Sequence, residues 1–122
     1  MVSMKKAHWD LVEVQALAAA RKVRWSASRA IDPLREVCGS QWKQHGLRIL
    51  GKLDEGAFHG TVDQHGIKFD VYGVRHEGIG WYVKLSIDNV LDAKGAVTEQ
   101  LFTISCHPLE RPLRTSGGQV QP

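Results

Sequence analysis

The fold of this chain is decided by four segments: Phe58-His-Gly-Thr-Val-Asp-Gln64, Ile67-Lys-Phe-Asp-Val-Tyr-Gly-Val74, Trp81-Tyr-Val-Lys-Leu-Ser-Ile-Asp88 and Leu101-Phe-Thr-Ile-Ser-Cys-His107. Hydrophobic and polar residues alternate along each of them. Neighbouring side chains of a β-strand point to opposite faces of a sheet, so this alternation predicts four strands with one buried face and one open face.

The alternation also predicts which residues lie on each face. The expected core face carries Ile67, Phe69 and Val71, then Trp81, Val83, Leu85 and Ile87, then Phe102, Ile104 and Cys106. The expected open face carries Lys68, Asp70 and Tyr72, then Tyr82, Lys84 and Ser86, then Thr103, Ser105 and His107. An antiparallel sheet covered by helices on one side has this pattern, and its open side is available for chemistry.

The residues before Phe58 are predicted to form helices. Asp10 is a suitable N-cap for a first helix, and Gly39 ends a second one that Asp32-Pro33 either restarts or kinks. Ser40 is the expected cap of a third helix that continues toward Leu53. Helices followed by an antiparallel meander indicate an α+β fold: two or three N-terminal helices packed on a twisted antiparallel sheet.

Glycine-containing turns separate the predicted strands. His65-Gly66 predicts a tight hairpin, and the residues from His76 to Gly80 predict a looser turn, so both histidines are expected to be exposed. Residues 89–98 read as a long mobile loop. We expect one domain over residues 1–110, followed by a disordered tail over residues 111–122.

The composition limits the class of protein. The 122 residues carry a net charge of +3, and Arg21, Lys22, Arg24, Arg29 and Arg35 form one basic stretch. This stretch suits either a polyanionic partner or a solvated surface. No apolar run is long enough to span a membrane and no signal-peptide core is visible, so we expect a cytoplasmic protein that does not bind membranes. The two cysteines are expected to be reduced.

Several short motifs resemble the MqsR family of bacterial toxins. They are His8 with Leu11 and Val14, Val23-Arg24 followed by Ser26-Ala27, Phe58-His-Gly-Thr61, Asp70-Val-Tyr72, Arg75, Tyr82-Val-Lys-Leu85 and Ile104-Ser105. The resemblance covers roughly residues 7–110. It implies a RelE-like fold and an endoribonuclease that cleaves messenger RNA (an mRNA interferase). It also implies a cognate antitoxin as partner, and therefore a type II toxin–antitoxin hetero-oligomer.

The chain departs from the family pattern at three positions. Gly60 stands where the family tends to carry a lysine, Phe69 stands in place of a glutamine, and His107 falls at a family lysine. The family's tyrosine and lysine do match, at Tyr82 and Lys84. The catalytic groups are therefore inferred from this chain's own residues.

RNA cleavage without a metal needs a base for the ribose 2′-OH, positive charge for the phosphate and an acid for the leaving oxygen. Histidine suits the proton steps, and tyrosine can stack on a base. We expect catalysis by His107, Tyr82 and Lys84, with His59 as a second proton-transfer group. The expected RNA-binding residues are Lys68, Tyr72 and Arg75.

Non-functional interpretations of the same residues are also open. The histidines suit solvated strand ends, and the lysines suit a soluble outer face. The six histidines show no metal-ligand spacing, so we expect no metal and no cofactor. Asp70 is expected to orient a neighbour or cap a loop. An alternative of a different class is a non-catalytic protein-interaction module of the same fold, which Gly60 and Phe69 favour.

Overall fold

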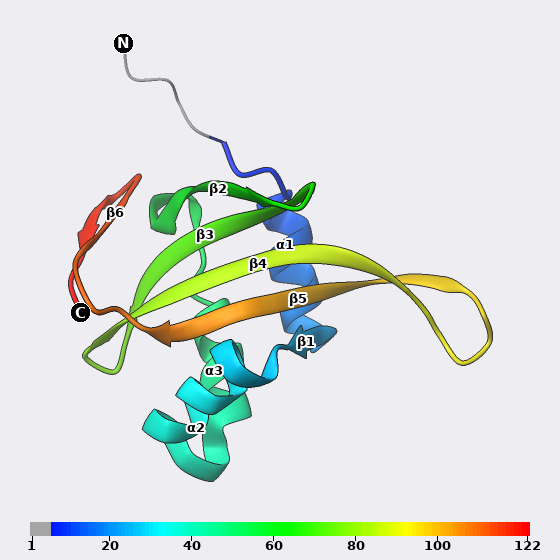
Figure 1. Cartoon of the computed structure of the whole chain (residues 1–122), viewed down its shortest axis with the longest axis horizontal. Helices are drawn as coiled ribbons and strands as arrows, with labels where there is room; N and C mark the ends of the chain where they lie inside the picture. The colour runs from blue at the N-terminus through cyan, green and yellow to red at the C-terminus, as the bar shows by residue number, and fades with distance from the viewer. Residues whose placement is uncertain (1–5) are drawn as a thin grey trace.

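The protein has an α+β fold built on a five-stranded mixed sheet, and the computed structural model describes its residues 6–122 (Figure 1). The helices are α1 (Leu11–Ala19), α2 (Asp32–Cys38) and α3 (Trp42–Leu50), with a π-helical turn η1 (Ala27–Ile31) and 3-10 turns η2 (Gly39–Gln41) and η3 (Glu55–Ala57). The strands are β1 (Val23–Trp25), β2 (Phe58–Gln64), β3 (Ile67–His76), β4 (Ile79–Leu91), β5 (Val97–Pro108), β6 (Leu113–Thr115) and β7 (Gly118–Val120).

The five strands lie in the order β1-β5-β4-β3-β2. Strands β2 to β5 form the expected antiparallel meander, but β1 pairs with β5 in parallel. The prediction of a purely antiparallel sheet is therefore wrong. A three-residue strand is too short to show an alternating pattern, and its pairing is with residues 101–103, far along the chain.

The helices begin and end largely as their capping residues predict. The Asp10 carboxylate accepts a hydrogen bond from the backbone N–H of Val12 at 3.0 Å, as an N-cap does. Gly39 ends α2 with a φ of 66°, a conformation that glycine adopts without strain. Ser40 does not cap α3, which begins after Gln41 without a side-chain cap.

The helices cover one face of the sheet (Figure 1). The β4 residues Trp81, Val83, Leu85 and Ile87 lie in the core between sheet and helices, as the alternation predicts. Leu34 of α2 and Leu50 of α3 pack into the same cluster. We call this side the helix face and the other side the open face.

Strand β3 has the opposite orientation to the one predicted. Tyr72 pairs with Val83 and lies in the core, whereas Val71 pairs with Lys84 on the open face. Paired residues of an antiparallel ladder point to the same side. The prediction failed because Phe69 to Val74 are all buried, so burial does not alternate along this strand.

A β-bulge divides β5 into two parts with different alternation. Lys84 pairs with Ser105 but Leu85 pairs with Thr103, which leaves Ile104 as the extra residue. Cys106 therefore lies in the core and His107 on the open face, as predicted. Phe102 and Thr103, which precede the bulge, lie opposite to their predicted faces, because the extra residue reverses the alternation on one side of the bulge relative to the other.

The turn at His65-Gly66 is as tight as predicted, and the other two hairpin connections are tighter than predicted. His65-Gly66 has φ angles of 55° and 83°, and Glu77-Gly78 has 51° and 81°, so both are two-residue turns. The prediction of a long mobile loop at residues 89–98 is wrong, since pairing continues to Leu91 and Val97. The β4–β5 hairpin therefore projects beyond the rest of the sheet (Figure 1).

The predicted disorder of residues 111–122 is also wrong. β6 and β7 form a hairpin that packs on β3, where a Cβ atom at Gly73 would lie 2.8 Å from the Leu113 side chain. Arg75 donates hydrogen bonds to the carbonyl oxygens of Gln121 at 2.9 Å and Pro122 at 3.4 Å. Glycine allows the close approach, and the guanidinium holds the segment in place.

Two further sequence expectations can be compared with the described residues. Cys38 and Cys106 are both free thiols, and burial raises the pKa of Cys106. No helix in residues 6–122 has the length and apolar character required to cross a membrane.

Candidate functional site

The open face holds a stacked pair of rings at one end of the sheet. Tyr82 and His107 face each other across the β4–β5 ladder, with ring centroids 4.9 Å apart and planes 14° from parallel. Burial raises the pKa of Tyr82 further above neutral pH, and its protonated phenol can donate a hydrogen bond. The sequence predicted that these two residues share this face.

The stacked imidazole has one bound nitrogen and one free nitrogen. The Nδ1 atom of His107 lies 3.0 Å from the carbonyl oxygen of Pro108. Because a carbonyl only accepts, Nδ1 is the donor of this contact, and in the neutral imidazole the lone pair is then on Nε2. Within residues 6–122, Nε2 is buried and has no hydrogen-bond partner. A substrate can therefore reach Nε2 only after the atoms that cover it move.

Lys84 lies two residues from Tyr82 on the same face, about 7 Å along the strand. Its ammonium is 5.9 Å from the centre of the Phe69 ring and donates a hydrogen bond to Gln64 Oε1 at 3.2 Å. Burial, followed by the nearby charge of Arg29, lowers the pKa of Lys84. A lowered pKa makes this ammonium a better proton donor than an exposed lysine.

Arg29 joins these groups from outside the sheet, and the sequence analysis did not assign it to the site. It lies in η1, whose start is fixed to β5 by the hydrogen bond from Ser26 Oγ to the Ile104 carbonyl at 2.6 Å. Its Nε lies 3.4 Å from Ser105 Oγ, and its charge reaches both Tyr82 and Lys84. The basic stretch was the only sequence signal for this residue.

His59 is not near this group. It lies at a bulge in β2, the edge strand, and its Nδ1 contacts the backbone carbonyl of Arg114. Three strand spacings, on the order of 14 Å, separate β2 from β5. His59 and His107 are thus too far apart to act on one phosphate.

Two of the three predicted RNA-binding residues face away from the site. Lys68 lies on the helix side, where it contacts Asp63 at 3.4 Å. Tyr72 is fully buried in the core, and burial followed by the nearby Asp70 carboxylate raises its pKa. Arg75 does lie on the open face, but carbonyl oxygens occupy its donors.

Asp70 connects the sheet to the segment before α1. Its buried carboxylate accepts hydrogen bonds from the backbone N–H groups of His8 at 3.0 Å and Trp9 at 2.8 Å, and from the Thr61 hydroxyl at 2.6 Å. Asp70 thus joins β3 to the segment before α1, and Tyr72 packs into the core on the helix face.

A second polar cluster lies on the helix face. His45 Nδ1 is 2.8 Å from His76 Nε2, and Glu77 Oε2 is 3.3 Å and 3.6 Å from these two nitrogens. Lys52 Nζ lies 2.8 Å from the other nitrogen of His76. His76 is buried, so its predicted exposure is wrong. Burial and then the Lys52 charge lower its pKa.

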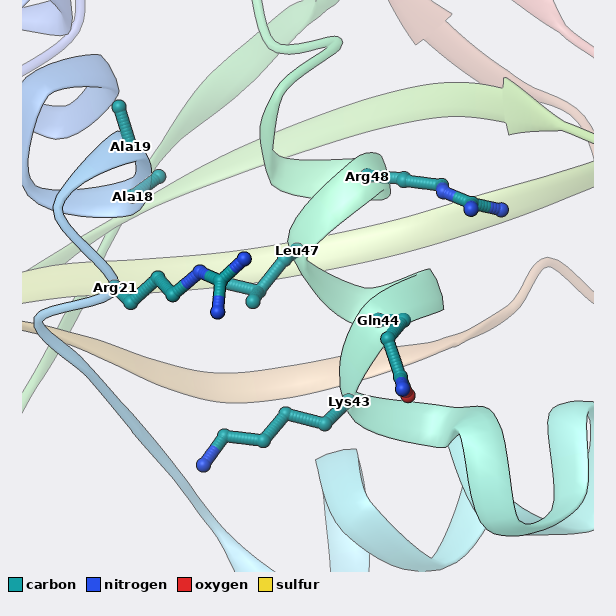
Figure 2. Close-up of a pocket in the computed structure, with 7 residues that line it drawn as sticks. All are labelled: Ala18, Ala19, Arg21, Lys43, Gln44, Leu47 and Arg48. Carbon is teal, nitrogen blue, oxygen red and sulfur yellow. The ribbon is translucent and has the colours of Figure 1, made fainter.

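A groove between α1 and α3 has a volume of about 610 Å³. Figure 2 shows Ala18, Ala19 and Leu47 along it, with Arg21 extending toward Leu47. Lys43 and Arg48 extend from α3 in different directions. The groove thus combines a small apolar surface with three cations at its rim.

Comparison with known proteins adds no identity. The chain matches no protein-family model, and no curated protein sequence matches it.

Proposed function

We propose that this protein is an endoribonuclease of the RelE-like type, the toxin of a type II toxin–antitoxin pair, and that it cleaves messenger RNA on the open face of its sheet. The observation that supports this most is the stacked Tyr82–His107 pair with Lys84 and Arg29 beside it. This group combines the residue types that the reaction needs, which are a ring pair, two cations and an imidazole.

Each side chain has a role in the proposed reaction. Nε2 of His107 removes the proton from the ribose 2′-OH, which attacks the adjacent phosphorus. Arg29 holds the phosphate oxygens and stabilises the charge that develops on them. Lys84 releases Gln64, binds the same phosphate and gives a proton to the leaving 5′-oxygen. Tyr82 orients the imidazole and offers an edge for a nucleobase.

Proton transfer by side chains is sufficient for this scheme, so we propose cleavage without a metal ion. His59 has no part in it, because it lies on the opposite edge of the sheet. In place of His59, Lys84 is the proposed donor of the proton to the leaving oxygen, and burial lowers its pKa.

The inhibitor is proposed to be an antitoxin that binds the groove between α1 and α3. Arg21, Lys43 and Arg48 line this groove together with the apolar residues Ala18 and Leu47, and Arg21 extends toward Leu47 (Figure 2). This combination complements an acidic amphipathic segment, whose apolar side chains would enter the groove and whose carboxylates would pair with the rim.

The alternative function is a non-catalytic interaction module of the same fold. The buried Nε2 of His107 favours it, because that atom is covered in the present conformation. The two functions differ in a direct assay of cleavage.

The test is cleavage of single-stranded RNA by purified variants. We expect His107→Ala to lower the rate by about 10²- to 10⁴-fold, the usual effect of losing a positioned proton-transfer group. Arg29→Gln and Lys84→Met should each lower it by at least about tenfold. His59→Ala is the matched control and should retain the full rate. Thermal unfolding of each variant separates lost chemistry from lost folding.

The outcomes are distinct. Cleavage that is equal in wild type and His107→Ala would place the site elsewhere, and a wild type that cuts no RNA would favour the interaction module. Activity lost only in the His59→Ala protein would contradict the assignment of roles.

The partner is tested with the protein encoded by the neighbouring gene. We expect Arg21→Glu and Lys43→Glu each to weaken its binding by at least tenfold in calorimetry, since each reverses one rim charge. Arg111→Glu, an exposed residue outside the groove, is the control. Equal binding by all three variants would remove the groove from the interface.

A further inference from the structure

The cluster of His45, His76 and Glu77 brings together residues from separate parts of the chain. His45 comes from α3, and His76 and Glu77 come from the end of β3 and the turn that follows it. Their ligand-type atoms all lie within 4.8 Å of one another. His76 is buried and His45 is half-buried, and both imidazoles lie beside the exposed carboxylate of Glu77, so three groups able to bind a metal converge at this point.

We propose that this cluster is a binding site for a divalent transition metal, with Zn²⁺ as the best fit. Imidazole and carboxylate are preferred ligands of zinc, and three protein ligands leave one coordination position for water. The ligand atoms would be His45 Nδ1, His76 Nε2 and Glu77 Oε2.

The geometry is close to that of a metal site. Usual zinc–ligand bonds of about 2.0–2.2 Å place tetrahedral ligands roughly 3.4 Å apart. Glu77 Oε2 lies 3.3 Å and 3.6 Å from the two nitrogens, near this value. The two nitrogens are 2.8 Å apart, so they separate by about half an ångström when the metal enters. Glu77 is exposed, which gives the ion a path from solvent.

Lys52 competes with the metal. Its ammonium lies 2.8 Å from His76 Nδ1 and 3.3 Å from the Arg75 carbonyl, to which it donates. A neutral imidazole has only one nitrogen lone pair, so His76 cannot accept from Lys52 at Nδ1 and bind an ion at Nε2 together. Metal binding therefore displaces the ammonium from His76.

A metal here would join α3 to the β3–β4 hairpin. It would lie on the helix face, whereas the Tyr82–His107 pair lies on the open face. The proposed metal site therefore does not depend on the function proposed for the open face.

The experiment uses the full chain without a histidine tag, dialysed against a chelator and titrated with Co²⁺ and Zn²⁺. Cobalt binding is followed by its visible absorption, and zinc binding by competition with a chromophoric chelator. We expect one equivalent of tightly bound metal and a higher unfolding temperature with zinc. His76→Ala and Glu77→Gln should each weaken binding by at least tenfold. His65→Ala, which alters an exposed turn histidine, should bind as the wild type does.

Three outcomes test the proposal. Lys52→Met should bind zinc more tightly than the wild type, because it removes the competing ammonium; unchanged affinity would contradict the competition. No binding by the wild type, or equal binding by Glu77→Gln, would overturn the site and leave only a hydrogen bond between two histidines. Glu77 is exposed, so its variant is expected to fold even if His76→Ala does not.

Discussion

Lys84 on the open face is expected to lower the stability of the folded protein. Lys84 has a lowered pKa because it is partly removed from water and faces the charge of Arg29. The folded protein therefore disfavours the charged form of this side chain. Side chains held in such a state mark functional sites more often than they contribute to folding.

Replacing Lys84 should show this cost. We expect Lys84→Met to raise the unfolding temperature at neutral pH while it lowers RNA cleavage. Lys84 binds its proton more tightly in the unfolded chain than in the folded one. The free energy of unfolding of the wild type therefore rises as the pH approaches the ordinary lysine pKa of 10.5. The difference between the two proteins should then shrink. Thermal unfolding from pH 7 to 10.5 measures it, and a gap that widens would contradict the assignment.

Asp70 has the opposite effect on stability. Its carboxylate accepts three hydrogen bonds, two of them from backbone groups before α1. We expect Asp70→Ala to lower the free energy of unfolding by about 2–4 kcal/mol, because charge-assisted bonds are lost and buried donors are left unpaired. Denaturant unfolding checks this. Asp63→Ala, an exposed carboxylate at the end of β2, is the control and should change stability by less than about 1 kcal/mol.

At the scale of elements, the contact of α3 with its neighbours depends on a glycine. A Cβ atom at Gly46 would lie 2.7 Å from the Trp25 ring and 3.2 Å from Leu34. Glycine to alanine usually stabilises an exposed helix by up to about 1 kcal/mol. Here we expect Gly46→Ala to destabilise by about 1–3 kcal/mol, as overpacking does. Gly51→Ala, at the C-cap of the same helix, is the control. If Gly46→Ala were stabilising, the Trp25 ring would have to move aside easily.

The sequence predicted elements better than it predicted their faces. The helix cap at Asp10, the turn at His65-Gly66 and the meander all follow from local rules that the structure confirms. The faces of β3 and part of β5 do not, because full burial hides alternation in one strand and a bulge at Ile104 reverses it in the other. Assigning faces by counting every second residue along a strand detects neither full burial nor a bulge.

The candidate site was predictable only in part for the same reason. Tyr82, Lys84 and His107 lie in regular stretches of β4 and β5, and their common face was predicted correctly. Arg29 comes from a π-helical turn, a structure that hydrophobic periodicity does not reveal. The cluster of His45 and His76 depends on long-range packing, which no short spacing encodes.

At the scale of the molecule, the proposed RNA binding should depend on salt. We expect the logarithm of the binding constant for single-stranded RNA to fall linearly with the logarithm of salt concentration, by about 0.7 per phosphate contact. Arg29→Gln should reduce the slope by about that amount. Arg21→Gln, whose side chain lies in the groove between the helices, should leave it unchanged. Fluorescence anisotropy measures the slopes, and equal slopes for all three proteins would contradict phosphate binding by Arg29.

The parallel pairing of β1 with β5 imposes an order on folding. Val23 reaches its partner Leu101 only when two segments separated by most of the chain have met. Closing so long a loop costs chain entropy before the compensating contacts between β1 and β5 can form. This cost slows folding. The ladder from β2 to β5 joins neighbours along the chain and can assemble earlier. Arg29 follows β1 closely in the sequence, so we expect it to reach Tyr82 and His107 only when β1 pairs with β5. A folding intermediate without that pairing would have the sheet from β2 to β5 but would lack Arg29 at the candidate site.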